Sequence, residues 1–261
     1  MRVDVVPKDS ALVNRKRTVL VLGATSAIAR AVAAELAARG FDLVLAGRDA
    51  EETGVLAGDL RLRHDVAVAA QMFDALSFDT HARFLDDCRA ASRNDLFGVV
   101  LCFGYLGDQT EAEANFTEAR RILDTNLLGA VSVLNLVARD LEAKREGFIC
   151  AISSVAGDRG RQSNYVYGAA KAGLTVYLQG LRNRLSRAGV RVITIKPGFV
   201  DTQMTYGRRG MFLVASPEAA ARRIVRAILD GKEVSYVPGF WRLVMVGIRA
   251  IPERVFKKTR L

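Results

Sequence analysis

The sequence is poor in cysteine and histidine, which limits the chemistry it can carry. Its three cysteines, Cys88, Cys102 and Cys150, are odd in number and scattered along 261 residues. We therefore expect free thiols in a reducing cytosol rather than a disulfide framework. No group of cysteine and histidine has the spacing of metal ligands, so no metal site is expected.

Long apolar runs are also missing. No run approaches the roughly 20 residues that a membrane-spanning helix needs, and residues 1–4, Met-Arg-Val-Asp, lack the apolar segment of a secretory signal. We expect a cytoplasmic protein. Half of the residues are hydrophobic, enough for a sizeable core, and the formal charge is +10. That charge suggests an anionic partner: a nucleotide cofactor, a nucleic acid or a membrane surface.

Apolar, strand-like runs alternate with helical patterns through most of the chain. The expected strands are residues 18–22, 41–46, 66–73, 96–103, 148–152, 190–195 and 234–237. A long helix is expected from about residue 112 to 144. This alternation predicts an α/β fold, a doubly wound parallel sheet of about seven strands with helices on both faces. We expect one domain over residues 1–261, carrying a basic, apolar C-terminal segment at 240–261.

The first strand runs into a glycine-containing turn and an alanine-rich helix. Gly23 permits the tight turn, and Thr25 and Ser26 can add hydroxyl donors. Backbone N–H groups and the helix dipole at such a turn favour a pyrophosphate. We therefore expect this turn, with Ala27 and Ile28 at the start of the helix, to hold part of a dinucleotide.

The ends of the second and third strands offer residues for the adenosine half. Arg48 and Asp49 follow the second strand. An arginine there accommodates a 2′-phosphate, whereas an acid binds the ribose hydroxyls. Arg48 favours NADP, and Asp49 keeps NAD open. Asp74, which closes the third apolar run, and the Ala75 backbone are expected near the adenine ring.

The pattern that best indicates catalysis lies in residues 154–171. Ser154 follows the fifth strand, and Tyr167 lies thirteen residues later (167 − 154). Lys171 is four residues beyond Tyr167, so both face one side of a helix. An ammonium at that distance favours the phenolate and lowers a tyrosine pKa from its usual value of about 10. Such a set can polarise a carbonyl and move a proton.

Other strand ends and one helix complete the candidate site. Gly104 after the fourth strand allows close approach of a flat ring. Asn126, expected in the middle of the long helix, is either a hydrogen-bond relay or a solvent-facing residue. Residues 205–215 are expected to form a mobile lid. The remaining expected cofactor contacts are Phe103, Pro197, Gly198, Val200 and Thr202.

Together these residues resemble the short-chain dehydrogenase/reductase family over nearly the whole chain. The matching features are Gly23-x-x-x-Ala27-x-Ala29, Asp74, Asn126, Ser154, Tyr167-x-x-x-Lys171 and Pro197-Gly198-x-x-x-Thr202. The sequence departs from the family at Ala27 and Ala29, where glycines are usual. It also departs at residues 101–104, Leu-Cys-Phe-Gly, where the family has Asn-Asn-Ala-Gly.

The resemblance implies a mechanism. Hydride passes between nicotinamide and a keto carbon, Tyr167 donates the proton, and Ser154 hydrogen-bonds the carbonyl oxygen. Lys171 holds the nicotinamide ribose as well as lowering the tyrosine pKa. Asn126 positions a water that relays protons to Lys171, and Thr202 with the Val200 backbone holds the carboxamide. The resemblance also implies a homo-oligomer, built in our expectation from the long helix and the helix after Tyr167, with apolar positions such as Leu174, Tyr177, Leu178 and Leu181.

A narrower branch is also similar, the decaprenylphosphoryl-2-keto-ribose reductases of arabinan biosynthesis. The similar stretches are residues 103–108, 164–168 and 240–258. This branch implies a polyprenyl-phosphate-linked 2-keto pentose as substrate. The alternatives are a general ketone or 3-oxoacyl reductase, and a nucleotide-sensing or nucleic-acid-binding protein without chemistry. The basic residues are spread along the chain without interleaved aromatics, so no nucleic-acid partner is expected.

The C-terminal segment interleaves apolar and basic residues. Trp241 and several aliphatic residues alternate with arginines and lysines, as in a helix that lies in the headgroup plane of a membrane. The alternative is that the segment folds back onto the core and keeps its charges in water. Pro252 argues against a single continuous helix in either case.

Overall fold

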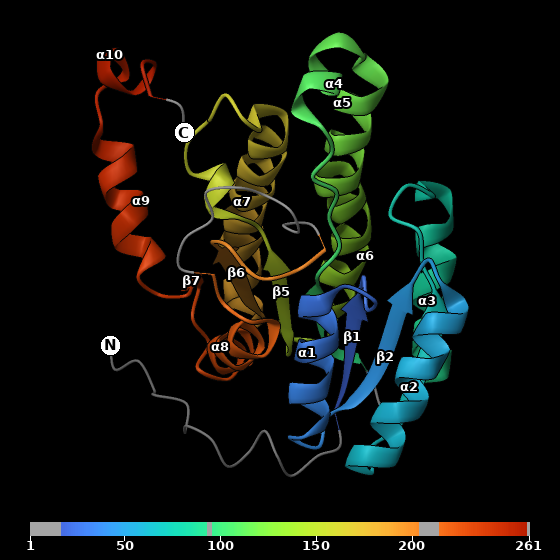
Figure 1. Cartoon of the computed structure of the whole chain (residues 1–261). Coiled ribbons are helices and arrows are strands. Elements are labelled where there is room, and N and C mark those ends of the chain that lie inside the picture. The colour runs from blue at the N-terminus through green and yellow to red at the C-terminus, as the bar shows by residue number, and fades with distance from the viewer. Residues whose placement is uncertain (1–16, 93–95, 204–213, 260–261) are drawn as a thin grey trace.

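A seven-stranded, all-parallel sheet forms the centre of the computed structural model, which describes residues 17–92, 96–203 and 214–259 (Figure 1). The strand order is β3-β2-β1-β4-β5-β6-β7. The strands are β1 (Thr18–Leu22), β2 (Asp42–Gly47), β3 (Val68–Met72), β4 (Leu96–Leu101), β5 (Phe148–Ile152), β6 (Arg191–Pro197) and β7 (Val234–Val237). The order reverses between β1 and β4, and in such sheets ligands bind at that point, beyond the carboxyl ends of the strands.

Helices cover both faces of the sheet, each over its own apolar cluster. On one face lie α1 (Ala27–Ala37), α2 (Ala50–His64) and α8 (Pro217–Leu229). On the other lie α3 (His81–Ala91), α6 (Gly129–Lys144) and α7 (Tyr165–Leu185). β1, β4 and β5 are buried at every position, which explains why they read as continuous apolar runs rather than alternating ones. The predicted doubly wound sheet is confirmed.

Local sequence signals set the helix ends. Ser26, Asp49 and Ser216 each accept a hydrogen bond from a backbone N–H in the first turn of α1, α2 and α8, the usual action of an N-cap. Pro217 occupies the first turn of α8, where its missing N–H costs nothing. Gly40, with φ of 81°, ends the turn after α1.

The expected long helix from 112 to 144 is confirmed as a helical run from Phe116 to Lys144, and it differs only in its start. The structure has α4 (Gln109–Ala114), α5 (Phe116–Leu123), a π-helical turn (Asp124–Leu128) and then α6. Asn115 breaks the helix because it is extended and its side chain caps α5 through the N–H of Thr117. Two strands also differ from their predicted limits. The third strand begins later, at Val68, and the sixth strand continues further, to Pro197.

Within the described residues, one helical run, Phe116–Lys144, is long and apolar enough to cross a membrane by length and composition alone. Its side chains Val133, Leu134 and Val137 lie in the core beneath the sheet, so the run is accounted for as a core helix. Cys88, Cys102 and Cys150 are free thiols, and burial raises the pKa of Cys88 and Cys102 to about 12.

The C-terminal segment forms two helices beside the β6–β7 edge of the sheet, at the left in Figure 1. They are α9 (Trp241–Ala250) and α10 (Glu253–Phe256), and Pro252 separates them as predicted. Trp241 and Met245 are buried against Val155 from the turn after β5. Short 3-10 turns at Phe78–Thr80, Val155–Gly157 and Ser186–Ala188 complete the described fold.

Candidate active site

One large cavity, about 880 Å³, opens at the carboxyl ends of the central strands. The predicted site residues line it, including Ser154, Tyr167 and Lys171, with the exceptions of Asn126 and the alternative Asp49. Segments far apart in the sequence meet here because parallel strands all present their carboxyl ends at one edge. The loops after β1, β2, β3, β4, β5 and β6 therefore share the cavity wall.

The turn after β1 has the geometry of an anion cradle. Gly23 adopts φ of 77°, and a Cβ there would lie 2.8 Å from Phe103 Cβ, so only glycine fits. Ser26 Oγ accepts from the N–H of Ala29, which fixes the start of α1. Thr25, Ala27 and Ile28 line the cavity at this helix N-terminus. Ala29 is fully buried, so its methyl group packs in the core and does not project into the cavity.

At the end of β2 the two candidate residues, Arg48 and Asp49, have different positions and partners. Arg48 is exposed and lines the cavity. The Asp49 carboxylate instead accepts a 2.8 Å hydrogen bond from the N–H of Glu52 and caps α2. Arg30, which sequence reasoning missed, also lines this wall, donates 3.0 Å to the Thr25 carbonyl and pairs with Glu52. Its position one helical turn from Ser26 could have identified it.

The loop after β3 places Asp74 and Ala75 in the cavity wall. Asp74 Oδ1 accepts from the N–H of Leu76 at 3.0 Å. The buried His81 imidazole hydrogen-bonds the Asp74 carbonyl at 3.0 Å and the Ser132 hydroxyl at 2.8 Å. This imidazole therefore ties the loop to α6. Sequence reasoning did not identify His81.

Ser154, Tyr167 and Lys171 come together as their spacing predicted. Ser154 sits just beyond β5, and its Oγ accepts a 3.0 Å hydrogen bond from the N–H of Ala156. That contact leaves the hydroxyl hydrogen to be donated towards the cavity. Tyr167 and Lys171 lie in the first two turns of α7, with Lys171 Nζ 5.7 Å from the Tyr167 ring centroid.

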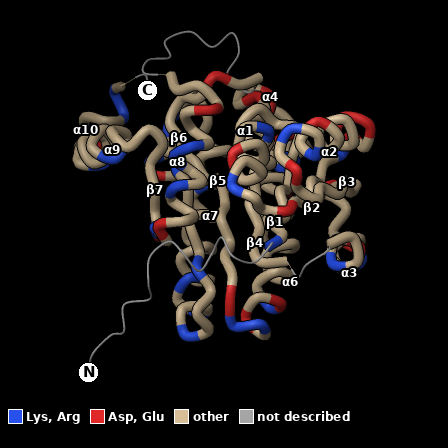
Figure 2. Tube along the Cα trace, turned by 90° about the horizontal axis from the view of Figure 1, so that it is seen from below, with Lys and Arg blue, Asp and Glu red and all other residues tan. Residues whose placement is uncertain are grey.

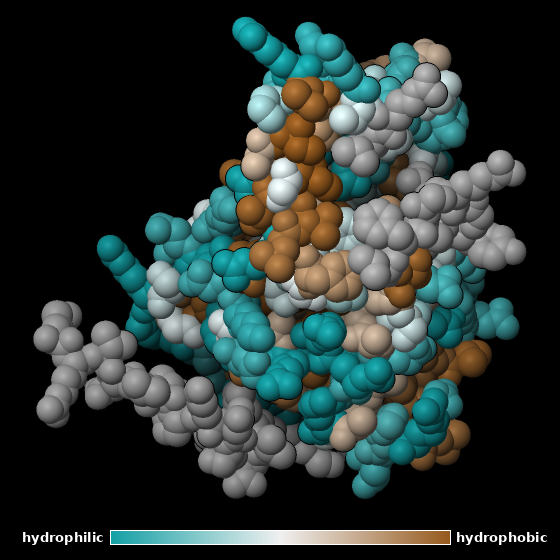
Figure 3. All heavy atoms as spheres, turned by 60° about the vertical axis from the view of Figure 1, so that its left-hand side comes forward, coloured by the Kyte–Doolittle hydropathy of each residue, from teal (hydrophilic) through white to brown (hydrophobic). Residues whose placement is uncertain are grey.

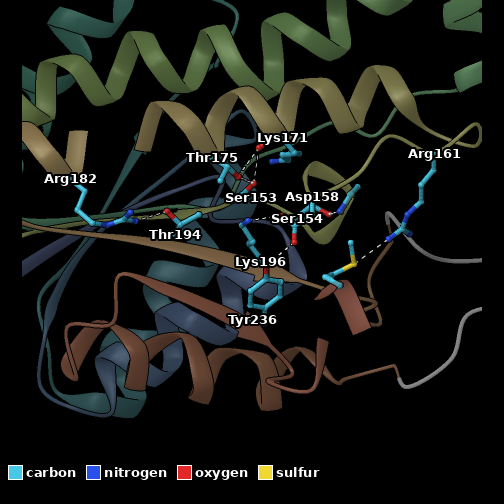
Figure 4. Close-up of polar contacts among 12 residues, drawn as sticks. Ser153, Ser154, Asp158, Arg161, Lys171, Thr175, Arg182, Thr194, Lys196 and Tyr236 are labelled. Carbon is cyan, nitrogen blue, oxygen red and sulfur yellow. Dashed lines mark hydrogen bonds and ion pairs between the residues drawn. The ribbon is translucent and has the colours of Figure 1, made fainter. Parts of the chain in front are cut away.

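Neighbouring hydroxyls hold α7 against β5 (Figure 4). The buried Ser153 Oγ donates to the Lys171 carbonyl at 2.9 Å and lies 2.8 Å from Thr175 Oγ1. Lys171 Nζ itself donates to the Ile152 carbonyl at 3.1 Å. Ser153 and Thr175 were not predicted. They fix the backbone from which the lysine side chain extends.

The Lys171 side chain is almost fully buried. Its exposed fraction is 3%, and burial lowers its pKa from 10.5 to about 8. None of the described residues forms an ion pair with it. A side chain whose pKa lies close to neutral pH can change its protonation state when charge develops nearby, as groups at functional sites often do.

Asn126 is buried, which excludes the solvent-facing alternative. Its Nδ2 donates to the carbonyls of Tyr105 at 2.5 Å and Ile122 at 2.8 Å, and its Oδ1 accepts from the Tyr105 N–H at 3.2 Å. A Cβ built on Gly104 would lie 2.9 Å from Asn126 Oδ1 and 3.3 Å from Lys171 Nζ. The two side chains thus converge on Gly104. The π-helical turn around Asn126 is of a kind frequent at functional sites.

The loop after β6 forms the opposite wall. Pro197, Gly198, Val200 and Thr202 line the cavity, and Val200 forms a parallel bridge with Ala215. A Cβ on Gly198 would overlap the Trp241 indole, so the C-terminal helix supports this loop directly. The predicted lid at 205–215 lies almost wholly outside the described residues.

Two ion pairs hold the loop after β5, one to the C-terminal helices and one to β6. The Arg159 guanidinium donates to the carbonyls of Ile248, Arg249 and Ile251, pairs with Glu253 at 2.8 Å and lies over the Phe256 ring. Asp158 pairs with Lys196 at 2.5 Å and accepts 2.8 Å from Tyr236 Oη. The sequence did not predict these contacts. The fold-back that was the alternative to membrane docking describes the buried side of the segment.

Three of the residues expected at a subunit interface are unavailable for one. Leu174, Leu178 and Leu181 pack into the core under the sheet, and Tyr177 packs against it and donates to Asn135. The helical period was assigned to the wrong face. The outward face of α7 instead presents Ala169, Val176 and Gly180, with Val176 65% exposed, while Gly173 packs against Leu127. Leu128, 49% exposed, lies in the π-helical turn that packs on α7.

Comparison with known proteins gives the same assignment. The family model for the short chain dehydrogenases matches residues 17–211. The chain belongs to the short-chain dehydrogenase family. An uncharacterised oxidoreductase of Streptomyces coelicolor is 38% identical over 258 residues, covering 97% of this chain and 99% of that protein. One from Mycobacterium tuberculosis (strain ATCC 25618 / H37Rv) is 36% identical over 240 residues, covering 92% and 96%.

A solved relative has the same fold. The short-chain dehydrogenase from Sphingobium yanoikuyae, solved in complex with NADPH, superposes with a TM-score of 0.76 at 24% identity, covering 91% of this chain and 97% of that one. Family membership makes the protein an NAD(P)-dependent oxidoreductase. The residues present fit such a cofactor, because the Gly23 turn and the α1 N-terminus line the cavity and Gly104 leaves room beside Lys171.

Proposed function

We propose that the protein is an NADPH-dependent reductase that converts the keto group of a polyprenyl-phosphate-linked 2-keto pentose to an alcohol. The observation that carries the proposal is the convergence of Ser154, Tyr167 and Lys171 in one cavity with the α1 N-terminus. The substrate rests on the resemblance of residues 103–108, 164–168 and 240–258 to one reductase branch.

In the proposed mechanism the bound cofactor supplies the hydride that reduces the carbonyl carbon. Tyr167 donates the proton to the oxygen as negative charge develops there. Ser154, already oriented by the Ala156 N–H, donates a hydrogen bond to the same oxygen. The Lys171 ammonium favours the phenolate that remains, and Asn126 holds the Tyr105 backbone in place beside it.

NADP is proposed over NAD from the wall at the end of β2. Asp49 is engaged as the cap of α2, while Arg48 lines the cavity. An arginine at this position accommodates a 2′-phosphate. Asp74 and Ala75 are proposed to contact the adenine, and Pro197, Gly198, Val200 and Thr202 the carboxamide end.

A homodimer is proposed through the outward face of α7. Small residues at 169 and 180 allow a second helix to approach closely, and Val176 with Leu128 would supply apolar contact. Members of this family are often oligomers. This assignment replaces Leu174, Leu178 and Leu181 with the side chains that the fold leaves outside.

A peripheral contact with the cytoplasmic face of a membrane is proposed for α9 and α10. Phe240, Leu243, Val246 and Val255 are 37%, 76%, 60% and 55% exposed, although the opposite side of these helices is buried. Figure 3 shows hydrophobic residues gathered in a stripe on this side of the molecule, with hydrophilic residues beside it. Basic neighbours such as Arg242 and Lys257 would add about 1 kcal/mol each at an anionic leaflet.

No nucleic-acid partner is proposed. In the part of the chain that the structure describes, basic and acidic residues are interspersed over the outer helices (Figure 2). Several of them pair with one another, as Arg63 does with Asp59 and Arg184 with Glu142.

The test is a cofactor-oxidation assay with a polyprenyl-phosphoryl 2-keto pentose, run with NADH and NADPH in parallel. The proposal expects turnover that prefers NADPH. A panel of simple ketones and 3-oxoacyl thioesters serves as the comparison. Higher kcat/KM on those compounds than on the keto sugar would assign the protein to general ketone or 3-oxoacyl reduction instead.

A further inference from the structure

An arginine outside the catalytic set lines the same cavity. Arg161 belongs to the loop that connects β5 with α7, between Ser154 and Tyr167 in sequence. Figure 4 shows its side chain extended towards the sulfur of Met245, separate from the Ser153 and Lys171 contacts. The Nη2 to Sδ distance is 3.6 Å. A thioether is a weak acceptor and carries no charge to offset a guanidinium.

The acidic groups around Arg161 are already paired. Asp158 holds Lys196 at 2.5 Å and also accepts from Tyr236, and Glu253 holds Arg159 at 2.8 Å. None of the described residues supplies a carboxylate within ion-pair distance of Arg161. Its Nε is buried without a hydrogen-bond partner, and burial lowers the pKa of this guanidinium. Asp158 offsets this lowering only in part, so within the described residues the Arg161 guanidinium lines the cavity without an ion-pair partner.

A second polar atom nearby is also unsatisfied. Asn164 lines the cavity three residues after Arg161, and its Oδ1 is buried with no partner. A buried acceptor left unpaired costs about 1–3 kcal/mol. Such groups in a native cavity point to a ligand that satisfies them, here one with both an anionic oxygen and a hydroxyl.

The cofactor does not account for these groups. The anion cradle is at β1 and Arg48 follows β2, whereas Arg161 follows β5, with β4 between β1 and β5 in the sheet. Arg161 and Asn164 lie instead on the connection that carries Ser154 and Tyr167. This is the side from which a carbonyl substrate reaches the catalytic groups.

We propose that Arg161 binds an anionic group of the substrate and that Asn164 accepts a hydrogen bond from a substrate hydroxyl. The planar guanidinium can offer two parallel N–H groups to the oxygens of a phosphate, phosphodiester, sulfonate or carboxylate. The proposal rests on the reductase function proposed above and specifies its substrate as an anionic, hydroxylated carbonyl compound. In the proposed keto sugar, the anion is the phosphodiester.

The kinetic test uses two matched substrates, a short-prenyl phosphoryl 2-keto pentose and the neutral prenyl ether of the same sugar. We expect wild type to prefer the phosphodiester by roughly 10- to 100-fold in kcat/KM, the range of one charge-assisted hydrogen bond. Arg161→Gln should bring this ratio close to one through KM, and Arg161→Lys should restore part of it. Arg187→Gln removes the same charge from an exposed turn and should retain the ratio.

A binding test is independent of turnover. Trp241, the single tryptophan, packs with Met245, so its fluorescence can report an anion on Arg161. With NADP⁺ saturating, inorganic phosphate should give a saturable change in wild type and Arg187→Gln, beyond that of potassium chloride at equal ionic strength. Arg161→Gln should lose this change while still binding NADP⁺.

The two tests separate the proposals. If the enzyme turns over neither sugar, that result counts against the proposed reductase substrate. The phosphate titration then tests the anion site independently of catalysis. A saturable phosphate response that persists in Arg161→Gln, or that wild type lacks, would overturn the role of Arg161. So would an unchanged preference for the phosphodiester in the Arg161→Gln variant.

Discussion

The Lys171→Met substitution should abolish catalysis and at the same time raise the stability of the folded protein. Burial lowers the pKa of Lys171 from 10.5 to about 8, a drop of about 2.5 pH units. At about 1.36 kcal/mol per pH unit, holding the ammonium in the cofactor-free fold costs about 3 kcal/mol. Methionine removes that cost but also removes the donor of the 3.1 Å hydrogen bond to Ile152, worth about 1 kcal/mol. We therefore expect the variant to be inactive yet about 2 kcal/mol more stable at pH 7.

The pH dependence gives the sharper test. Because the folded-state pKa lies below the unfolded value of 10.5, the folded wild type binds fewer protons than the unfolded chain between about pH 8 and 10.5. The contribution of Lys171 to wild-type stability therefore rises with pH across that window and is lowest below about pH 8. The advantage of Lys171→Met should shrink by about 2 kcal/mol between pH 7 and pH 9.5.

Urea unfolding of the cofactor-free protein, at one protein concentration and both pH values, measures these differences. Lys196→Met is the matched control, because Lys196 is also buried but has Asp158 at 2.5 Å. Removing Lys196 leaves a carboxylate unpaired, so this variant should lose stability. The reasoning would be refuted if Lys171→Met were less stable than wild type by the same amount at both pH values.

Three further variants test the outlying parts of the account. Arg48→Ala should weaken NADPH binding by about 1.5–3 kcal/mol and leave NADH nearly unchanged; equal effects on both cofactors would place the Arg48 contact elsewhere. Val176→Glu should convert a dimer to a monomer in light scattering at micromolar concentration, whereas a wild type that is already monomeric would refute the α7 interface. Leu243→Glu with Val246→Glu should abolish salt-sensitive co-sedimentation with anionic vesicles while cofactor binding survives; retained sedimentation, or none by wild type, would contradict the membrane contact.

Much of this architecture was accessible from the sequence because the strongest signals are local. Seven apolar runs predicted the seven strands of the sheet. Spacing alone placed Tyr167 and Lys171 together, since residues four apart share one side of a helix.

The errors arose where tertiary contacts decide. Nothing local shows that Asn115 caps one helix and ends another, or that the apolar leucines of α7 face inward while small residues face out. The sequence favoured Arg48 but left Asp49 as an alternative, and the fold then placed the Asp49 carboxylate at a helix N-terminus and the Arg48 guanidinium in the cavity wall. Arg161 attracted no attention in the sequence because its lack of an acidic partner is a property of the folded loop.

The most direct test of the central claim is single-turnover oxidation of NADPH by wild type and Tyr167→Phe with a polyprenyl-phosphoryl 2-keto pentose. Phenylalanine removes only the hydroxyl of a side chain that is 8% exposed, so NADPH affinity should stay within a factor of a few. Loss of the proton donor should slow the chemical step by about 10²- to 10⁴-fold. Hydride transfer at the wild-type rate in Tyr167→Phe would contradict the account.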